Sequence, residues 1–151
     1  MNIYLYFLYL ILTALILALW EIQIEGKHGW ASRLPTKRFN NDLVKSISGG
    51  RPITGYHLMM LLTILVLIHL PVFFTDWSWY NEAKIIGFFI LMLTIEDFLW
   101  FVFNPDWGIS EFKKSRKLWW HPGWLLGLPI FYWFTIPIGI LVILWGFAII
   151  G

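Results

Sequence analysis

The sequence predicts an all-α integral membrane protein, in which four helices form a bundle and short interfacial helices lie in the two cytoplasmic loops. The chain of 151 residues is 59% hydrophobic and only 13% charged, which leaves too little polar surface for a soluble domain of this size. Its apolar residues gather in four runs of spanning length. Each run is continuous, whereas the strands of a membrane barrel alternate apolar and polar residues. The whole chain, residues 1–151, is therefore expected to form a single transmembrane domain.

The four predicted spans cover about residues 3–20, 56–75, 85–103 and 124–150. At about 1.5 Å of rise per residue, each run as a helix is long enough to cross a bilayer. No basic segment precedes the first run and no small-residue cleavage site follows it, so we expect a retained helix rather than a signal peptide. Asn104-Pro105 is expected to end the third span, because proline cannot continue a helix.

The basic residues predict how the chain is oriented in the membrane. Ten of the eleven Lys and Arg residues lie in two connections, residues 21–55 and 104–123, and the connection between them holds only Lys84. Loops rich in Lys and Arg stay on the cytoplasmic side. We therefore expect both basic loops to be cytoplasmic and both termini to lie outside.

Both basic loops also carry patterns that are typical of the membrane interface. The first is expected to hold a short amphipathic helix, capped by Asn40 or Asn41, whose apolar face is formed by Phe39, Leu43, Val44 and Ile47. The second combines a basic stretch with an aromatic belt, Lys113, Lys114, Arg116, Lys117, Trp119, Trp120 and Trp124. Membrane lipids are the expected partners, and a homo-oligomer is compatible with the pattern. Nucleic acid is not expected, because the basic stretch is short and juxtamembrane.

Two adjacent carboxylates, Glu96 and Asp97, interrupt the third apolar run. Each charge inside a bilayer costs about 2.5–3.5 kcal/mol on insertion scales, so charged residues kept there commonly have a function. Other acids and histidines are expected at the same depth, at the ends of the neighbouring spans. The set predicted to lie together is Glu21, Glu25, His28, His57, Glu96, Asp97 and His121.

These seven residues are candidate metal ligands, because carboxylates and neutral imidazoles bind divalent transition metals. Iron or zinc is the expected metal. The chain has no cysteine, which excludes thiolate ligands and disulfides. The spacing Glu25-x-x-His28 resembles the Glu-x-x-His element of di-iron carboxylate proteins over these four residues, and no activity is inferred from that spacing.

Three functions from different classes agree with this pattern. The first is a membrane metalloprotein or metalloenzyme, with a polar site near the cytoplasmic face, that acts on a lipidic substrate. The second is an oligomeric ion or proton channel or transporter that uses Glu96 and Asp97. The third is a non-catalytic scaffold or accessory subunit, in which the same acids form buried ion pairs with Arg33, Arg51 or Lys117.

Overall fold

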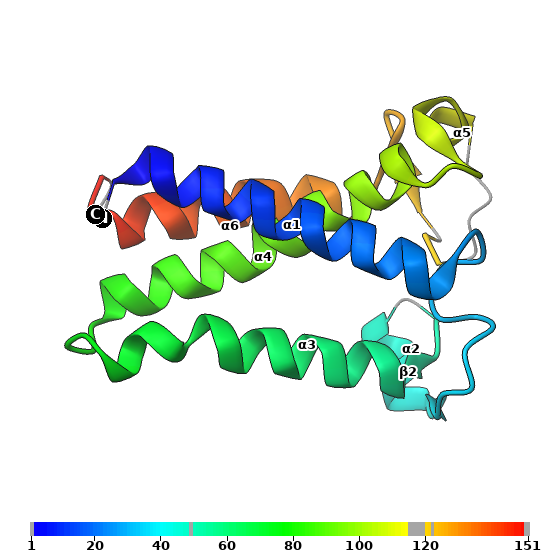
Figure 1. Ribbon diagram of the computed structural model, residues 1–151, viewed down its shortest axis with the longest axis horizontal. Coiled ribbons are helices and arrows are strands. Elements are labelled where there is room, and N and C mark those ends of the chain that lie inside the picture. Colours follow the sequence, from blue (N-terminus) through cyan, green and yellow to red (C-terminus); the bar gives the residue numbers. More distant parts are fainter. Residues whose placement is uncertain (1, 49, 115–119, 122, 150–151) are drawn as a thin grey trace.

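The structure is a computed structural model that describes residues 2–48, 50–114, 120–121 and 123–149 (Figure 1). The described chain is mostly helical. Three of its segments are long and apolar enough to cross a membrane, namely Ile3–Glu25, Gly55–Phe73 and Trp79–Phe103. The predicted class, a helical membrane protein, agrees with this architecture.

The elements follow one another with short connections. The long helices are α1 (Ile3–Glu25), α3 (Gly55–Ile68), which continues into the 3₁₀ helix η1 (Leu70–Phe73), α4 (Trp79–Phe103) and α6 (Tyr132–Gly146). Two seven-residue helices, α2 (Asp42–Ser48) and α5 (Gly108–Lys114), lie in the connections. Two antiparallel strand pairs complete the fold: β1 (Arg38–Phe39) with β2 (Ile53–Thr54), and β3 (Trp124–Leu125) with β4 (Leu128–Pro129).

Helix α4 occupies the middle of the structure, with α1 and α6 packed along it (Figure 1). Their shared core includes Leu10, Met92 and Ile143, which are completely buried. Helix α3 stands apart from this group. Only 11% of the most apolar stretch in Gly55–Phe73 is buried, against 44% of the corresponding stretch in α4. Most of α3 therefore faces the surroundings of the protein.

Glycines allow α4 and α6 to pack closely. A Cβ atom on Gly87 would lie 2.5 Å from Cγ1 of Ile143, and one on Gly146 would lie 2.9 Å from the backbone nitrogen of Lys84. The Thr94 hydroxyl adds a hydrogen bond across the same interface, 2.8 Å to Oγ1 of Thr135. Small residues and interhelical hydroxyl bonds are how helices associate in lipid, where the hydrophobic effect does not drive them together.

Several element boundaries differ from the sequence prediction. Helix α1 continues beyond residue 20 to Glu25, and α4 begins at Trp79 rather than at residue 85. The second run becomes 3₁₀ after His69, where Pro71 lacks an amide hydrogen. The predicted fourth span, residues 124–150, is wrong at its start. Residues 124–129 form a β-hairpin, and the helix that follows is the shorter α6.

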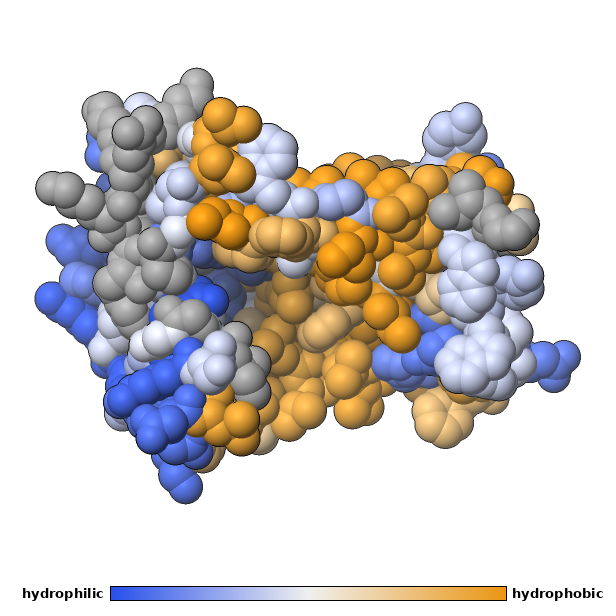
Figure 2. All heavy atoms as spheres, turned by 180° about the vertical axis from the view of Figure 1, so that it is seen from behind, coloured by the Kyte–Doolittle hydropathy of each residue, from blue (hydrophilic) through white to orange (hydrophobic). Residues whose placement is uncertain are grey.

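The two long connections lie at one end of the molecule, and the turn between η1 and α4 lies at the other (Figure 1). The start of α1 and the end of α6 share one end, and α2, α5 and both strand pairs share the other (Figure 1). Asn41 caps α2 as expected, because its Oδ1 accepts a 2.8 Å hydrogen bond from the amide of Val44. Of the predicted lipid-binding stretch, residues 115–119 lie outside the described part. Figure 2 shows an apolar belt between the polar ends.

Candidate metal centre

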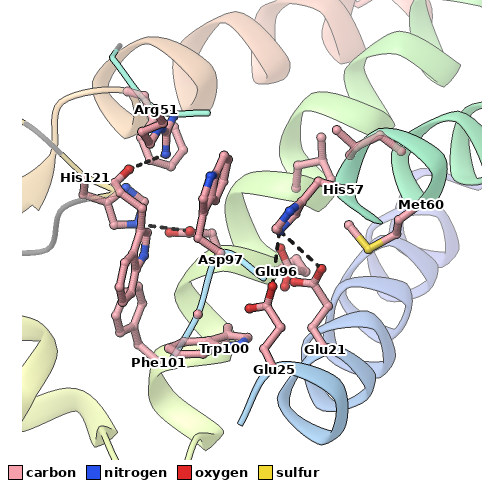
Figure 3. Close-up of a pocket in the computed structure, with 16 residues that line it drawn as sticks. Glu21, Glu25, Arg51, His57, Met60, Glu96, Asp97, Trp100, Phe101 and His121 are labelled. Atoms are coloured by element: carbon pink, nitrogen blue, oxygen red, sulfur yellow. Dashed lines mark hydrogen bonds and ion pairs between the residues drawn. The ribbon is translucent and has the colours of Figure 1, made fainter. Parts of the chain in front are cut away.

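A cavity of about 220 Å³ lies where α1, α3 and α4 meet the polar end of the molecule. Six of the seven sequence-predicted site residues line it, namely Glu21, Glu25, His57, Glu96, Asp97 and His121 (Figure 3). They come from three helices and from the connection before β3. The expectation that distant parts of the chain bring ionisable groups to one pocket agrees with this geometry.

Glu21, Glu25 and His57 form the tightest group in the cavity. Nε2 of His57 lies 3.4 Å from Oε1 of Glu25 and 4.0 Å from Oε1 of Glu21. All three residues are buried, and one ligand atom from each falls within 4.8 Å of the others. The two glutamates share a helix face because α1 continues through Glu25, which places residues four apart one above the other.

Thr54 orients the His57 ring from the N-terminus of α3. Its Oγ1 accepts a 3.2 Å hydrogen bond from the His57 amide and also lies 2.7 Å from Nδ1 of the ring. Thr54 is completely buried, so this contact is fixed. With Nδ1 held by the hydroxyl, the other ring nitrogen, Nε2, points at the two glutamates, as in metal sites where an outer hydrogen bond orients a ligating imidazole.

The loop after α1 folds back over Glu25 in an unusual conformation. Gly29, Trp30 and Ala31 have φ angles of 56°, 51° and 48°, which is the left-handed region that residues with a Cβ rarely adopt. This turn aims the amide of Ala31 at Oε1 of Glu25, at 2.5 Å. Strained backbone of this kind costs about 1–3 kcal/mol for each residue and is often found at functional sites.

The connection after α4 holds that loop in place. The side-chain amide of Asn104 donates to the carbonyl of Gly26 at 2.8 Å, and Nε1 of Trp107 donates to the carbonyl of Lys27 at 3.0 Å. From the other side, the Arg38 guanidinium donates to the carbonyl of Ala31 at 2.8 Å. The first two of these bonds join residues that are 78 and 80 positions apart in the chain. The position of Glu25 thus depends on a segment that is distant in the sequence.

Glu96 completes the acidic side of the cavity. Its carboxyl group interacts electrostatically with that of Glu21 across the cavity, and the residue is only 6% exposed. Among the described residues, neither Oε1 of Glu96 nor Oε1 of Glu21 has a hydrogen-bond partner. Two buried carboxyl groups that interact in this way require a shared proton or a cation, because both cannot remain charged without compensation.

Asp97 and His121 form a separate group on the other side of the cavity. Nε2 of His121 lies 3.1 Å from Oδ1 of Asp97, and the Tyr132 hydroxyl donates to Oδ2 of Asp97 at 2.5 Å. The His121 ring stacks on Phe131, with ring centroids 5.3 Å apart. The structure therefore pairs Asp97 and His121 with each other, while Glu21, Glu25 and His57 gather opposite them (Figure 3).

Arg51 supplies a positive charge at the wall of the cavity. Its guanidinium lies over the Trp30 ring, 4.4 Å from the centroid, and the same ring stacks on His57 at 4.5 Å. Arg51 also donates to the backbone carbonyl of Trp120. Burial lowers the pKa of the guanidinium and the charge of Asp97 counteracts this, so the group stays positively charged at neutral pH.

Two histidines lie outside the cavity. His28 sits on the loop after α1 and does not line the cavity, so the Glu25-x-x-His28 spacing does not bring both residues to one site. Partial desolvation, together with the charges of Arg33 and Lys27, lowers the pKa of His28. At the opposite end of α3, Nε2 of His69 lies 3.0 Å from Oε1 of Glu82.

Four contributors to the site escaped the sequence prediction as site residues: Thr54, Trp30, the Ala31 amide and Tyr132. Thr54 had a usable signal, since a threonine three residues before His57 is in the N-cap position. The two glycines that flank Lys27 and His28 also indicated unusual backbone there. Neither signal predicts that an amide or a hydroxyl would contact a particular carboxylate.

Comparisons of the chain with known protein families, with curated proteins and with solved structures give no match.

Proposed function

We propose that this chain is a membrane-embedded metalloprotein whose Glu21, Glu25 and His57 bind one divalent transition metal, iron or zinc. The observation that supports this most directly is their convergence. Three ligand atoms from two helices lie within 4.8 Å of one another and are buried. Glu96 is the proposed fourth ligand, because it lines the same cavity as Glu21 and one of its oxygens has no hydrogen-bond partner in the described structure.

The charge balance of the cavity favours a bound cation. Glu21, Glu25, Glu96 and Asp97 all line it, and Arg51 is the one Lys or Arg among the described lining residues. Removing an uncompensated carboxylate from water costs several kcal/mol, and the cost recurs for each additional acid. A divalent ion would offset two of these charges and would satisfy the unpaired oxygens at the same time.

We place the proposed metal site in a protein with four membrane spans. In this proposal α6 is the fourth span, although its 15 residues rise only about 22 Å, and the hairpin before it enters the interface. Helices α2 and α5 lie along the membrane surface, the basic loops are cytoplasmic and the termini are outside. Labelling single-cysteine variants Asn40→Cys and Asp76→Cys in intact cells tests this, because an impermeant maleimide should reach only Asp76→Cys.

Elemental analysis of protein purified without a histidine tag tests the metal site. We expect about one equivalent of iron or zinc per chain, and Glu25→Ala and His57→Ala should each remove most of it. His28→Ala is the matched control, since it removes an imidazole three residues from Glu25 that lies outside the cavity. Substoichiometric metal that is unaffected by Glu25→Ala or by Glu96→Ala would rule the site out.

The position of the site at membrane depth supports a lipidic substrate. The cavity is also lined by apolar side chains of the spanning helices, including Met60, Leu61 and Leu93, against which a hydrocarbon chain can pack. Transport is the main alternative, and it predicts cation or proton flux in proteoliposomes that Glu96→Gln and Asp97→Asn abolish. A scaffold predicts neither metal nor flux. In that case a charge-reversal pair such as Glu96→Lys with Arg51→Glu, the cation that lines the same cavity, should restore folding.

A further inference from the structure

A groove on the outside of α3 leads toward the cavity. It has a volume of about 740 Å³ and runs between Trp20 of α1 and the exposed side of α3, from Tyr56 to Leu67. Tyr56 and Leu67 are eleven residues apart, which corresponds to about 16 Å of helix. Because α3 is the least buried of the three long apolar segments, this groove opens sideways toward the space that lipid would occupy, rather than toward water.

The groove and the cavity share a wall. Met60 lines both and is 8% exposed. Tyr56 lines the groove, and its buried hydroxyl has no hydrogen-bond partner among the described residues but is influenced by the charge of Glu21. The Met60 and Tyr56 side chains therefore form part of the wall between the groove and the proposed metal ligands. Methionine is the most adaptable of the large apolar side chains, so it can yield to an incoming chain.

The two ends of the groove differ in chemistry. Its long wall on α3 is apolar, since the Thr63 hydroxyl is satisfied internally by the carbonyl of Met59 at 2.8 Å. Its other end is the connection before β1, where Lys37 is the one charged residue among the described lining groups. This rim is fixed to α3, because the Gly55 amide donates to the Lys37 carbonyl at 2.7 Å and the Tyr56 amide donates to Oγ1 of Thr36 at 2.8 Å.

We propose that the groove binds a membrane lipid with an anionic head group, whose hydrocarbon chain lies along α3 and whose head group lies at Lys37. This names the substrate class of the metal centre and rests on the proposed function. The apolar wall matches a lipid chain, and the single positive charge at the interfacial end matches a phosphate that carries no compensating cation. The lipid then enters sideways from the membrane, with the part nearest Met60 and Tyr56 closest to the metal ligands.

Photocrosslinking in nanodiscs tests this proposal. The probes are phosphatidylglycerol and phosphatidylcholine, each with a diazirine in one acyl chain, and the adducts are mapped by mass spectrometry. Phosphatidylglycerol adducts should concentrate on Met59, Thr63 and Leu67 and should exceed phosphatidylcholine adducts there. Lys37→Gln should reduce that preference about fivefold, as expected for one lysine near an anionic lipid. Lys45→Gln, which removes a charge from the same connection outside the groove, should leave it unchanged.

A second pair of variants tests the groove itself, one that blocks it and one that serves as the control. Thr63→Trp should fill it and remove most adducts, whereas Val66→Trp places the same ring on α3 at a position that is 70% exposed and does not line the groove. Leu67→Trp repeats the test should Thr63→Trp fail to fold. Equal labelling by both lipids, labelling spread evenly around α3, or crosslinks between two copies of the chain through the groove would each overturn the proposal.

Metal content measured on the same samples separates the two proposals. The groove variants should retain their metal, because they lie outside the ligand set. If anionic lipid labels the groove of a protein that holds no metal, the lipid site is supported and the metal centre is overturned. Metal with no lipid preference would do the reverse.

Discussion

Replacing Tyr132 with phenylalanine tests whether Asp97 is braced by a hydrogen bond rather than held by a metal. Tyr132 is 3% exposed and its hydroxyl donates to Oδ2 of Asp97 at 2.5 Å. Its ring also contacts Phe131 edge-on, with centroids 4.7 Å apart. Tyr132→Phe keeps the ring in place and removes only the hydroxyl, so the change in stability reports the hydrogen bond itself.

The expected loss follows from the charge of the acceptor. A hydrogen bond to a charged group contributes about 1.5–3 kcal/mol, against about 0.5–1.5 kcal/mol for a neutral pair. Tyr6 is the neutral comparison, because its hydroxyl donates to the backbone carbonyl of Lys84 at 2.6 Å. Tyr4 is 80% exposed and serves as the baseline. The free energy of unfolding should therefore fall most for Tyr132→Phe, less for Tyr6→Phe and negligibly for Tyr4→Phe.

The assay is equilibrium unfolding in mixed micelles, with a double-mutant cycle between Tyr132→Phe and Asp97→Asn. Groups in direct contact show coupling energies of about 0.5–3 kcal/mol. Metal content should remain at the wild-type level in Tyr132→Phe, because the hydroxyl faces Asp97 and not the group formed by Glu21, Glu25 and His57. A Tyr132→Phe protein as stable as Tyr4→Phe, with no coupling to Asp97, would refute the pairing described here.

Two further substitutions examine how the helices and the loop support the site. Gly146→Ala should lower the free energy of unfolding by about 1–3 kcal/mol, because the added Cβ would meet backbone atoms of α4 at 2.9 and 3.0 Å. Gly139→Ala should cost less, since the atom it meets at 2.6 Å belongs to the flexible Leu91 side chain; equal losses in micelle unfolding would contradict this. Asn104→Ala removes the 2.8 Å bond to the Gly26 carbonyl and should weaken metal binding about tenfold without removing a ligand. Chelator competition measures that effect, and an unchanged affinity would show that the bond does not position Glu25.

The sequence was sufficient for the membrane class and for the neighbourhood of the site. Long apolar runs predict helices, because backbone groups in lipid must be satisfied within the segment. Ionisable residues within or beside those runs are conspicuous, since burying them is costly. Helical rise alone then indicates that Glu96 and the ends of the neighbouring spans share one depth.

The sequence was less reliable where apolar composition and backbone geometry disagree. Residues 124–131 are as apolar as part of a membrane-spanning helix. Residues 124–129 nevertheless form a hairpin, in which Leu126 and Gly127 have φ angles of 51° and 84°. Apolar composition measures burial in lipid and does not encode turn type. The end of α1 shows the converse, because the acids Glu21 and Glu25 lower its hydropathy although the helix continues through them.

Residue types and their spacing along the chain therefore identify the candidate site residues. The packing of the helices determines which of these residues pair. Depth along a helix follows from residue number, so seven candidates were expected at one depth, and six of them line one cavity. Their direction around each helix axis depends on how α1, α3 and α4 pack, and that packing places Glu21 and Glu25 against His57, and Asp97 against His121 and Tyr132. His28 lies outside because its loop turns through left-handed backbone, and contacts from Asn104, far away in the chain, and from the nearby Arg38 hold that loop.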